Sequence, residues 1–443
     1  MNALPQLSLT QLSAMLRRGE TSSTAIVGAC IAAIDALDAK LHAFVDVYRD
    51  DAMRLAEAAD LERQAGFVRG PLHGLPIAIK DLFHIEGRVT TAGSKRWRGR
   101  VAQETALSVK RLLAAGMIPL GKTHLVEFAY GTWGMNRPMG TPWNPRDMNV
   151  HRVAGGSSSG SAVAVAAGMA PAALGTDTGG SVRIPAALCG LVGLKPTYGR
   201  IPLDGVVPLS GTLDSIGPIT QTVDDARMLV AAMAGDAMPA PAARETLDGM
   251  AITAIGHDQL PDFIEPQIVE AYDQTIALLR ELGADVRIER IPFDFASLGS
   301  RNGRIIGIEG YANHREVIDD ESADVDAGVR ARMLLGKAAT ATDYIEALDE
   351  RRAWIGKFAE WMQAREALLT PMLPITAKPV TEVDEAAFPL ATWSRAVNYM
   401  QACAISVPAP AEGLPAGMQI VAADSHDATL TRIAARLLEG ARR

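Results

Sequence analysis

Residues 155–186 read GGSSSGSAVAVAAGMAPAALGTDTGGSVRIPA and contain two glycine-rich turns, each of which presents a serine. The first turn leads into a run of alanine and valine, and the second is followed by an apolar stretch, so both turns are embedded in apolar sequence. A cluster of Gly and Ser is most often a flexible loop. In a core, successive glycines have another use, because they let several backbone N–H groups converge on one point, as an oxyanion hole requires.

Strands and helices are predicted to alternate on both sides of this stretch. Apolar runs of strand length occur at residues 75–80, 117–120, 172–175, 251–255, 286–291, 368–374 and 405–408. Apolar residues at helical spacing occur within 8–64 and at 107–115, 265–282, 341–368 and 427–442, and a helix is predicted to end at Gly168. A chain that alternates in this way favours a helix-covered mixed sheet. We therefore expect an α/β fold.

Length and composition fit one large domain. The chain has 443 residues, of which 48% are hydrophobic and 21% are charged, a balance typical of folded rather than disordered proteins. Large α/β enzymes reach this length as a single domain. We expect one domain over 1–443, with a helical segment at 1–64, a catalytic core at 65–235, a linker-like loop at 236–250 and a C-terminal part at 251–443.

Charge and cysteine content argue against several classes of partner and compartment. The net charge is −8, and the most basic run, KRWRGR at 95–100, is typical of a solvated loop, whereas nucleic-acid-binding proteins usually carry a basic patch. The longest apolar run, at 162–175, is too short to span a bilayer. The N-terminus does not resemble a signal peptide, and the three cysteines are far apart. We expect a cytoplasmic protein with no nucleic-acid or membrane partner.

A second motif, GMIPLGKT at residues 116–123, matches the letters of a phosphate-binding P-loop. Such a loop follows a strand and cradles phosphates with the backbone N–H groups of a flexible turn. Here the preceding residues predict a helix, and the apolar residues between the two glycines predict the strand itself. The context therefore argues against nucleotide binding.

A third motif, GSSSG at residues 156–160, matches the nucleophile elbow of α/β-hydrolases and would make Ser158 the nucleophile. An elbow needs an apolar strand before it, and residues 149–154, NVHRVA, are a weak candidate for one. The histidines available as bases, none in a distinctive context, are His257, His314 and His426. This interpretation is weaker than one in which each glycine turn contributes a serine.

Four segments of the chain resemble the amidase signature family. Residues 155–186 match the defining segment of that family position by position, and GPLHGLPIAIKD at 70–81 resembles the segment that carries its catalytic lysine. CGLVGLKPTYGR at 189–200 and GLPAGMQI at 413–420 resemble further landmarks of the family. The resemblance implies a single large mixed β-sheet with helices on both faces, and an amide-hydrolysing activity.

The resemblance also implies a role for each matching residue. Ser181 corresponds to the nucleophile, Ser157 to a bridging serine preceded by a cis peptide bond, and Lys80 to the base. The implied oxyanion hole consists of the backbone N–H groups of Thr178, Gly179, Gly180 and Ser181. The implied supporting network consists of Ser158, Asp177 and Arg183, although Arg183 could instead contact a substrate carboxylate.

Lys80 can serve as a base only if its pKa is lowered. The pKa of free lysine is about 10.4, so few molecules are neutral at pH 7. Burial disfavours the ammonium form and lowers that pKa, and a place at the end of an apolar strand suits burial. Without the resemblance, an ordinary ion pair between Lys80 and the adjacent Asp81 would be the simpler interpretation.

The predicted reaction is hydrolysis of a small-molecule carboxamide through an acyl-enzyme, with no metal or cofactor. His124 and Glu127 have a helical spacing, but a third metal ligand is not apparent. The resemblance places a wall of the substrate pocket at Tyr130, Thr132, Trp133 and Met135. An apolar or aromatic acyl group would suit these side chains, which would otherwise only pack the loop.

Other functions stay open at this point. The family includes the glutaminase (A-type) component of tRNA-dependent amidotransferases, which works with partner subunits, and also biuret- and ureido-amide hydrolases. A non-catalytic binding protein is a further class, against which the intact triad argues. NYMQAC at residues 398–403 replaces the family's usual Asn-x-x-Gly-Leu-Pro, and proline often stands where this chain has Ala154. The substrate therefore stays open, as does a homodimer.

Overall fold

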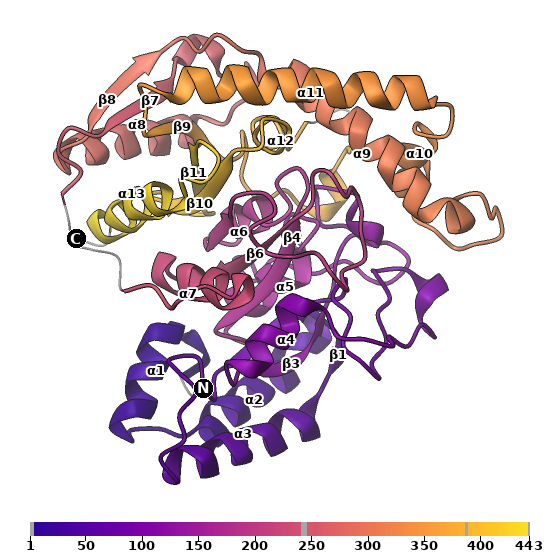
Figure 1. Ribbon diagram of the computed structural model, residues 1–443, viewed down its shortest axis with the longest axis vertical. Coiled ribbons are helices and arrows are strands. Elements are labelled where there is room, and N and C mark those ends of the chain that lie inside the picture. Colours follow the sequence, from indigo (N-terminus) through magenta and orange to yellow (C-terminus); the bar gives the residue numbers. More distant parts are fainter. Residues whose placement is uncertain (1–3, 241–245, 386–388, 442–443) are drawn as a thin grey trace.

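The computed structural model describes residues 4–240, 246–385 and 389–441. Within these residues, 11 strands form one mixed sheet of order β1-β3-β2-β4-β6-β5-β10-β11-β9-β7-β8 (Figure 1). The strands are β1 Phe44–Val47, β2 Pro76–Lys80, β3 Ile118–Thr123, β4 Ala172–Asp177, β5 Val192–Lys195, β6 Ser215–Thr220, β7 Ala251–Ile255, β8 Asp285–Glu289, β9 Ala367–Pro371, β10 Cys403–Ala409 and β11 Ala416–Ala422. This confirms the predicted fold class.

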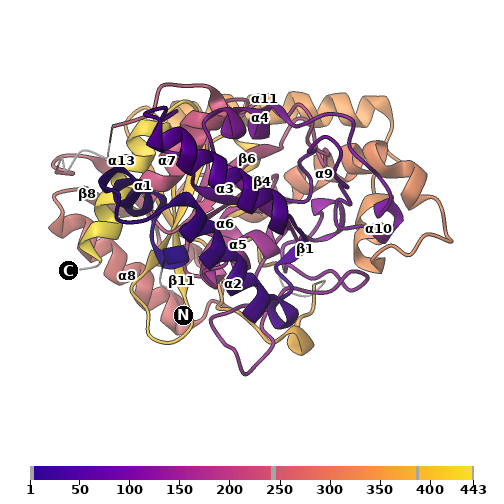
Figure 2. The same cartoon turned by 90° about the horizontal axis from the view of Figure 1, so that it is seen from below.

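The helices surround the sheet on both of its faces. They are α1 Leu9–Arg18, α2 Ser23–Leu41, α3 Arg49–Gln64, α4 Leu107–Ala114, α5 Ser159–Ala166, α6 Arg183–Leu188, α7 Val223–Ala234, α8 Pro266–Glu281, α9 Phe295–Ile318, α10 Ala327–Leu334, α11 Ala341–Met362, α12 Ser394–Tyr399 and α13 Asp427–Gly440. Seen from below, α2 and α3 lie across the N-terminal end of the fold (Figure 2). Short 3-10 turns complete the described elements.

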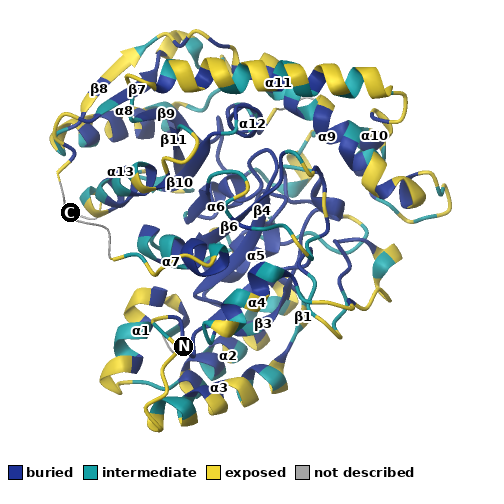
Figure 3. Cartoon of the chain, in the orientation of Figure 1, coloured by how far each residue is buried: buried dark blue, intermediate teal, exposed yellow. Residues whose placement is uncertain are grey.

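Alternate residues of the central strands pack into different clusters. In β2, Ile77 and Ile79 join the cluster that contains side chains of α4, α7 and α13. Ala78 between them joins the cluster that contains side chains of α2, α3 and α5. Successive residues of a strand point to opposite faces of the sheet, so these two groups of helices cover opposite faces. The central strands are accordingly buried along their whole length, whereas β8 at the edge is partly exposed (Figure 3).

The direction of the strands places the motifs of the sequence. β2 runs parallel to both β3 and β4, whereas β4 and β6 are antiparallel. The carboxyl ends of β2 and β4 therefore meet at the same edge of the sheet. In open α/β sheets this edge is the usual place for a ligand site. Lys80 ends β2 and Asp177 ends β4.

The predicted strands and helices are largely confirmed, with differences at several places. β1 interrupts the region 8–64, because a four-residue strand is too short to show a period. The helix predicted over 341–368 ends at Met362, and its last residues begin β9. β6 and α7, and later α9 and α10, fill parts of the chain for which no element was predicted.

The context of residues 116–123 is also as expected. α4 precedes Gly116, and the segment between the glycines is β3, which contains Gly121 and Lys122. The Lys122 ammonium is buried and donates to the Asp81 carboxylate at 2.8 Å. A strand whose lysine is paired in this way offers no loop for a phosphate.

Strands from both sides of the linker-like region join the same sheet, because β5 pairs with β10. Residues 241–245 of that region lie outside the described residues, and the division into segments stays a prediction. All three cysteines are buried and unpaired. None of the helices in the described ranges is long and apolar enough to cross a membrane.

Candidate active site

The lysine at the end of β2 lies under both serine turns. Its Nζ is 2.9 Å from Ser157 Oγ, 2.9 Å from Ser158 Oγ and 2.8 Å from Thr176 Oγ1. Lys80 is fully buried. Three hydroxyl groups therefore take the place of water around this amine, in agreement with the implied contact between Lys80 and Ser157.

The environment of Lys80 lowers the pKa of its ammonium to about 7. Burial is the main cause, because it disfavours the charged form. The carboxylates of Asp214 and Asp177 oppose the effect and hold the pKa higher than burial alone would. A lysine with this pKa is about half neutral at pH 7 and has a lone pair that can accept a proton.

The first serine turn is held by hydrogen bonds to the irregular segment that precedes it in the chain. The Gly156 N–H donates to the Thr132 carbonyl at 2.7 Å, and the Val126 N–H donates to the Ser157 carbonyl at 3.1 Å. The peptide bond between Gly156 and Ser157 is cis, as the resemblance implied. A Cβ at position 156 would lie 2.8 Å from the Gly134 nitrogen, so only glycine fits there.

The two turns are connected directly. The Ser158 N–H donates to the Ser181 carbonyl at 3.2 Å. Ser157 and Ser158 have no exposed surface, whereas Ser181 is 6% exposed. Of the three serines, Ser181 is therefore the one that a substrate can reach.

The Asp177 carboxylate organises the second turn. It accepts the Gly180 N–H at 2.8 Å and the Val182 N–H at 3.1 Å. It also accepts from Arg183 Nη2 at 2.8 Å and from Asn398 Nδ2 at 3.0 Å. Burial alone would raise the pKa of Asp177, but the Arg183 guanidinium holds that pKa well below its usual range. A charged carboxylate with this many donors fixes the turn rigidly.

Arg183 is fully buried and is committed to the protein. Besides Asp177, its guanidinium donates to the Gln419 side chain, to the Asn398 side chain and to the Ser394 carbonyl. These contacts agree with the supporting role. The guanidinium is fully buried and each of its three nitrogens already donates to the protein, which favours the supporting role over contact with a substrate carboxylate.

Two side chains hold the carbonyl groups of the second turn on one side. Asn302 Nδ2 donates to the Thr178 carbonyl at 3.4 Å, and Ser394 Oγ donates to the Gly179 carbonyl at 2.7 Å. The C=O and the following N–H of a trans peptide point in opposite directions. The Gly179 N–H therefore points away from Asn302, which is how an N–H group is aimed at a developing oxyanion.

The four N–H groups of the implied oxyanion hole are not equivalent. The N–H groups of Thr178, Gly179 and Ser181 have no acceptor among the residues that the structure describes. The Gly180 N–H, in contrast, is engaged by Asp177. Gly180 has a φ of +119°, and a Cβ there would lie 2.4 Å from Ser394 Oγ. Its part in the turn is thus conformational, and three N–H groups stay available to an oxyanion.

The elbow interpretation of Ser158 finds no support. Residues before Ser158 form no strand, and its Oγ contacts Lys80 instead of a histidine. His257 bonds to Asp273, His314 bonds to the Pro208 carbonyl, and His426 bonds to the Asp424 carbonyl.

Among the described residues, the possible metal pair has no third ligand beside it. Glu127 Oε2 accepts the Asp326 N–H at 2.7 Å, and burial is the main cause that lowers the pKa of His124 to about 4. Across residues 4–240, 246–385 and 389–441, no group of three or more His, Cys, Asp or Glu side chains could hold a metal ion.

A cavity of about 530 Å³ lies beside the two turns. Thr132, which holds the first turn, lines it together with Arg395, whose stem approaches Gly179 of the second turn. Of the other pocket residues that the resemblance implied, Trp133 and Met135 belong to a buried apolar cluster. Tyr130 is buried, and its carbonyl accepts from Arg332. That pocket therefore stays a prediction, for which Thr132 has the most direct support.

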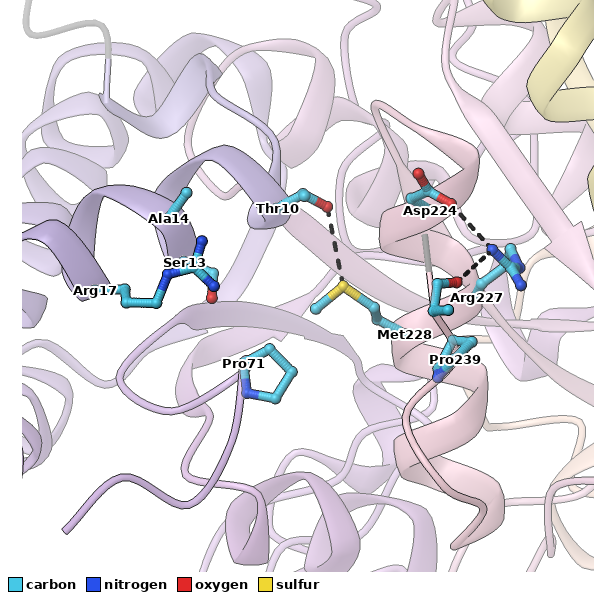
Figure 4. Close-up of a pocket in the computed structure, with 10 residues that line it drawn as sticks. Thr10, Ser13, Ala14, Arg17, Pro71, Asp224, Arg227, Met228 and Pro239 are labelled. Carbon is cyan, nitrogen blue, oxygen red and sulfur yellow. Dashed lines mark hydrogen bonds and ion pairs between the residues drawn. The ribbon is translucent and has the colours of Figure 1, made fainter. Parts of the chain in front are cut away.

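A second, smaller cavity of about 300 Å³ lies between α1 and α7, far along the chain from either serine turn. Figure 4 shows Thr10 beside Met228 at its centre and Arg227 next to Asp224 at its rim. None of its lining residues belongs to the two turns or to β2.

Several polar residues of the site carry no local motif. Thr176 contacts Lys80, and Asp214 accepts the Thr178 hydroxyl. Burial is the main cause that raises the pKa of Asp214 to about 6. Thr176 adjoins Asp177 in the sequence and could have been suspected, but Asp214, Asn302 and Ser394 lie on distant elements. Only the fold reveals them.

Comparison with known proteins gives one consistent family. The family model described as Amidase matches residues 25–431. The chain is 36% identical to the A-type subunit of glutamyl-tRNA(Gln) amidotransferase from Acidothermus cellulolyticus, over 99% of this chain and 95% of that protein.

Among solved structures, the crystal structure of an amidase superposes with a TM-score of 0.89 at 32% identity, covering 97% of this chain and 99% of the other. The A-type subunit of glutamyl-tRNA(Gln) amidotransferase from Thermotoga maritima superposes with a TM-score of 0.79 at 30% identity, covering 97% and 94%. The backbone is therefore similar to proteins of both kinds.

Proposed function

This chain belongs to the amidase family, and on that premise we propose that it hydrolyses a small-molecule carboxamide through an acyl-enzyme on Ser181. As a member of the family it is a hydrolase that acts on carbon–nitrogen bonds. The observation that carries the finer proposal is the 2.9 Å contact between Lys80 Nζ and Ser157 Oγ. This contact gives a fully buried serine a base, next to the turn that presents Ser181, which is 6% exposed.

In the acylation step, Ser181 Oγ attacks the carbonyl carbon of the amide. Its proton passes to Ser157 Oγ, whose own proton passes to the neutral Lys80 Nζ. A serine hydroxyl needs such a base, because it is a weak nucleophile by itself. The depressed pKa of Lys80 supports this role, since the amine is available near neutral pH.

The tetrahedral intermediate carries a negative charge on the former carbonyl oxygen. The N–H groups of Thr178, Gly179 and Ser181 are the donors that we assign to it. Donors held in place before the reaction stabilise this charge without reorganisation. The Asp177, Asn302 and Ser394 contacts supply that rigidity.

Collapse of the intermediate breaks the carbon–nitrogen bond and releases ammonia or an amine. Ser157 gives its proton to the leaving nitrogen and regains one from Lys80. Water then attacks the ester on Ser181, with the same relay removing its proton. The products are the free carboxylate and the regenerated enzyme.

The test measures ammonia or amine release from aliphatic, aryl, arylacetyl, ureido and glutamine amides. We expect Ser181→Ala to lower kcat by at least about 1,000-fold, with Tm nearly unchanged because no hydrogen bond between its hydroxyl and a described residue is lost. Ser159→Ala is the matched control, since the Ser159 hydroxyl is buried without a partner among the described residues and should keep full activity. Activity that survives in Ser181→Ala would refute the proposed nucleophile.

Glutamine is the substrate of a second candidate function. The amidotransferase relatives favour it, since a glutaminase of that kind would release ammonia from glutamine for a partner protein. Turnover of glutamine with no turnover of other amides would support that function. Turnover confined to the ureido amides would instead support a biuret-type hydrolase.

A further inference from the structure

No residue of either serine turn lines the cavity, but two of its lining residues contact the turns. Thr132 lines it and accepts the Gly156 N–H with its carbonyl. Arg395 lines it from the other side, and a Cβ at Gly179 would lie only 3.0 Å from Arg395 Cγ. A molecule in this cavity would therefore lie against residues that contact both turns.

Arg395 differs from the other arginines of this region. It is partly buried, yet its guanidinium has no hydrogen bond or ion pair with any residue that the structure describes. Tyr130 and a second cation, Arg332, are the titratable groups that act on it. Residues 386–388, outside the described ranges, are Ala-Ala-Phe and contain no acid.

The one carboxylate that lines the cavity within the described residues is already neutralised. Glu385 pairs with Arg137 at 3.2 Å and with Arg332 at 3.1 Å. Burial lowers the pKa of Arg395, opposed by the nearby Tyr130. A partly desolvated cation without a partner is unfavourable, and an anion supplied by a ligand would relieve it.

We infer that Arg395 binds a carboxylate of the substrate, so that the enzyme selects amides whose acyl part carries a negative charge. This inference rests on the proposed amide hydrolysis at Ser181. The guanidinium and the carboxylate would form a two-point pair in a cavity with apolar walls such as Phe295 and Leu390. Reduced solvent screening strengthens such a pair.

The reach of the Arg395 side chain bounds the length of the acyl chain. The arginine stem passes Gly179, and the guanidinium nitrogens extend roughly 4–5 Å beyond Cγ by covalent geometry. A carboxylate that meets them while the amide carbonyl meets Gly179 needs about two to four intervening carbon atoms. The expected substrates are the monoamides of short dicarboxylic acids, such as succinamate and glutaramate.

Glutamine fits this cavity less well, although it also carries a carboxylate at a suitable distance. Its α-ammonium would need an acidic partner. Glu385, the acid available along the cavity, is held by two arginines. We therefore expect glutaramate, which lacks the ammonium, to be turned over in preference to glutamine.

The kinetic test compares each anionic amide with its neutral isostere, succinamate with succinamide and glutaramate with glutaramide. We expect wild type to favour the anionic partner in kcat/KM by at least about tenfold, as one charge-assisted pair is worth about 1.5–3 kcal/mol. Arg395→Gln should lower this anionic-to-neutral ratio to about one, mainly through KM. Arg395→Lys should restore part of it.

Arg18→Gln is the matched control, because it removes one guanidinium from an exposed ion pair with Glu20 on α1. It should leave the ratio as in wild type. An equal ratio in wild type and Arg395→Gln would overturn the inference while leaving amide hydrolysis intact. If wild type hydrolysed none of the amides, or if Ser181→Ala kept full turnover, the proposed function would be refuted instead.

A binding experiment tests Arg395 without catalysis. Glutarate, the dicarboxylate product, should raise the Tm of wild type and of Ser181→Ala, and should have no effect on Arg395→Gln. Glutaramide, the neutral analogue, should raise none of them to the same extent. A glutarate shift that persists in Arg395→Gln, or that is absent from wild type, would overturn the inference.

Discussion

Arg183 and Arg395 lie on two sides of the same turn and differ in every contact of their side chains. Arg183 is fully buried, and its guanidinium meets Asp177, Asn398 and Gln419. Arg395 lines a cavity, and no acceptor for its guanidinium is found in the part of the chain that the structure describes. The protein itself supplies the hydrogen-bond acceptors of Arg183, whereas Arg395 is available to a bound ligand.

The same difference separates the floor of the site from its wall. The floor consists of the ends of β2 and β4 with the two serine turns, where hydroxyls, carboxylates and amides satisfy one another. The wall is built by α9, α12 and the segment before α12, where the Arg395 guanidinium has no partner among the described residues. Polar groups whose hydrogen bonds are satisfied within the protein keep the reacting residues in place. Polar groups without a partner are available to bind a ligand.

The largest effect on stability is expected from Arg183→Met, which removes the paired arginine from the floor of the site. It leaves the Asp177 carboxylate buried without its cation, so the free energy of unfolding should fall by about 3–5 kcal/mol. Arg287→Met, at an exposed pair with Asp285, should cost far less. Urea unfolding measures both, and equal losses would contradict the role of Arg183.

The pH dependence of the reaction tests the role of Lys80 in the floor of the site. Its pKa of about 7 means that the amine is protonated below pH 7 and neutral above it. Since the neutral amine is the base, kcat/KM should fall by about tenfold for each pH unit below 7 and level off above it. Lys80→Arg, which stays protonated, should be inactive throughout. A flat profile between about pH 5 and 8 would contradict this assignment of the base.

The smallest effect is expected from Arg395→Met, which tests the wall. No hydrogen bond to a described residue is lost, and an unpaired charge leaves a partly dry site, so the free energy of unfolding should stay equal or rise by up to about 1 kcal/mol. The change in Tm should thus be opposite in sign to that of Arg183→Met. A loss as large as that of Arg183→Met would show that Arg395 has a structural partner.

The floor could be predicted from the sequence because its parts are local. The strand that ends at Lys80 is an uninterrupted apolar run, and each serine lies in a glycine turn of a few residues. Chain direction then brings them together, since β2 and β4 are parallel neighbours. The resemblance to amidases added the roles of Ser157 and Ser181, which residue types alone left open.

The wall could not be predicted in this way. Arg395 lies among ordinary residues of a short helix, and Asn302 lies within α9, which the periodicity did not reveal. Asp214, which accepts the Thr178 hydroxyl, follows a loop without a motif. Each becomes part of the site only through contacts with residues far away in the chain.

By itself, the sequence determined the alternation of strands and helices, the two serine turns and the lysine beneath them. These depend on backbone preferences and on the burial of neighbouring residues, both of which are written locally. Only the tertiary structure decided which carbonyls of the second turn accept hydrogen bonds from side chains, and that the Gly180 N–H donates to Asp177. It also decided that Arg183 is paired while Arg395 has no partner among the described residues. Whether a polar group finds a partner depends on what the fold places beside it, and no window of sequence contains that information.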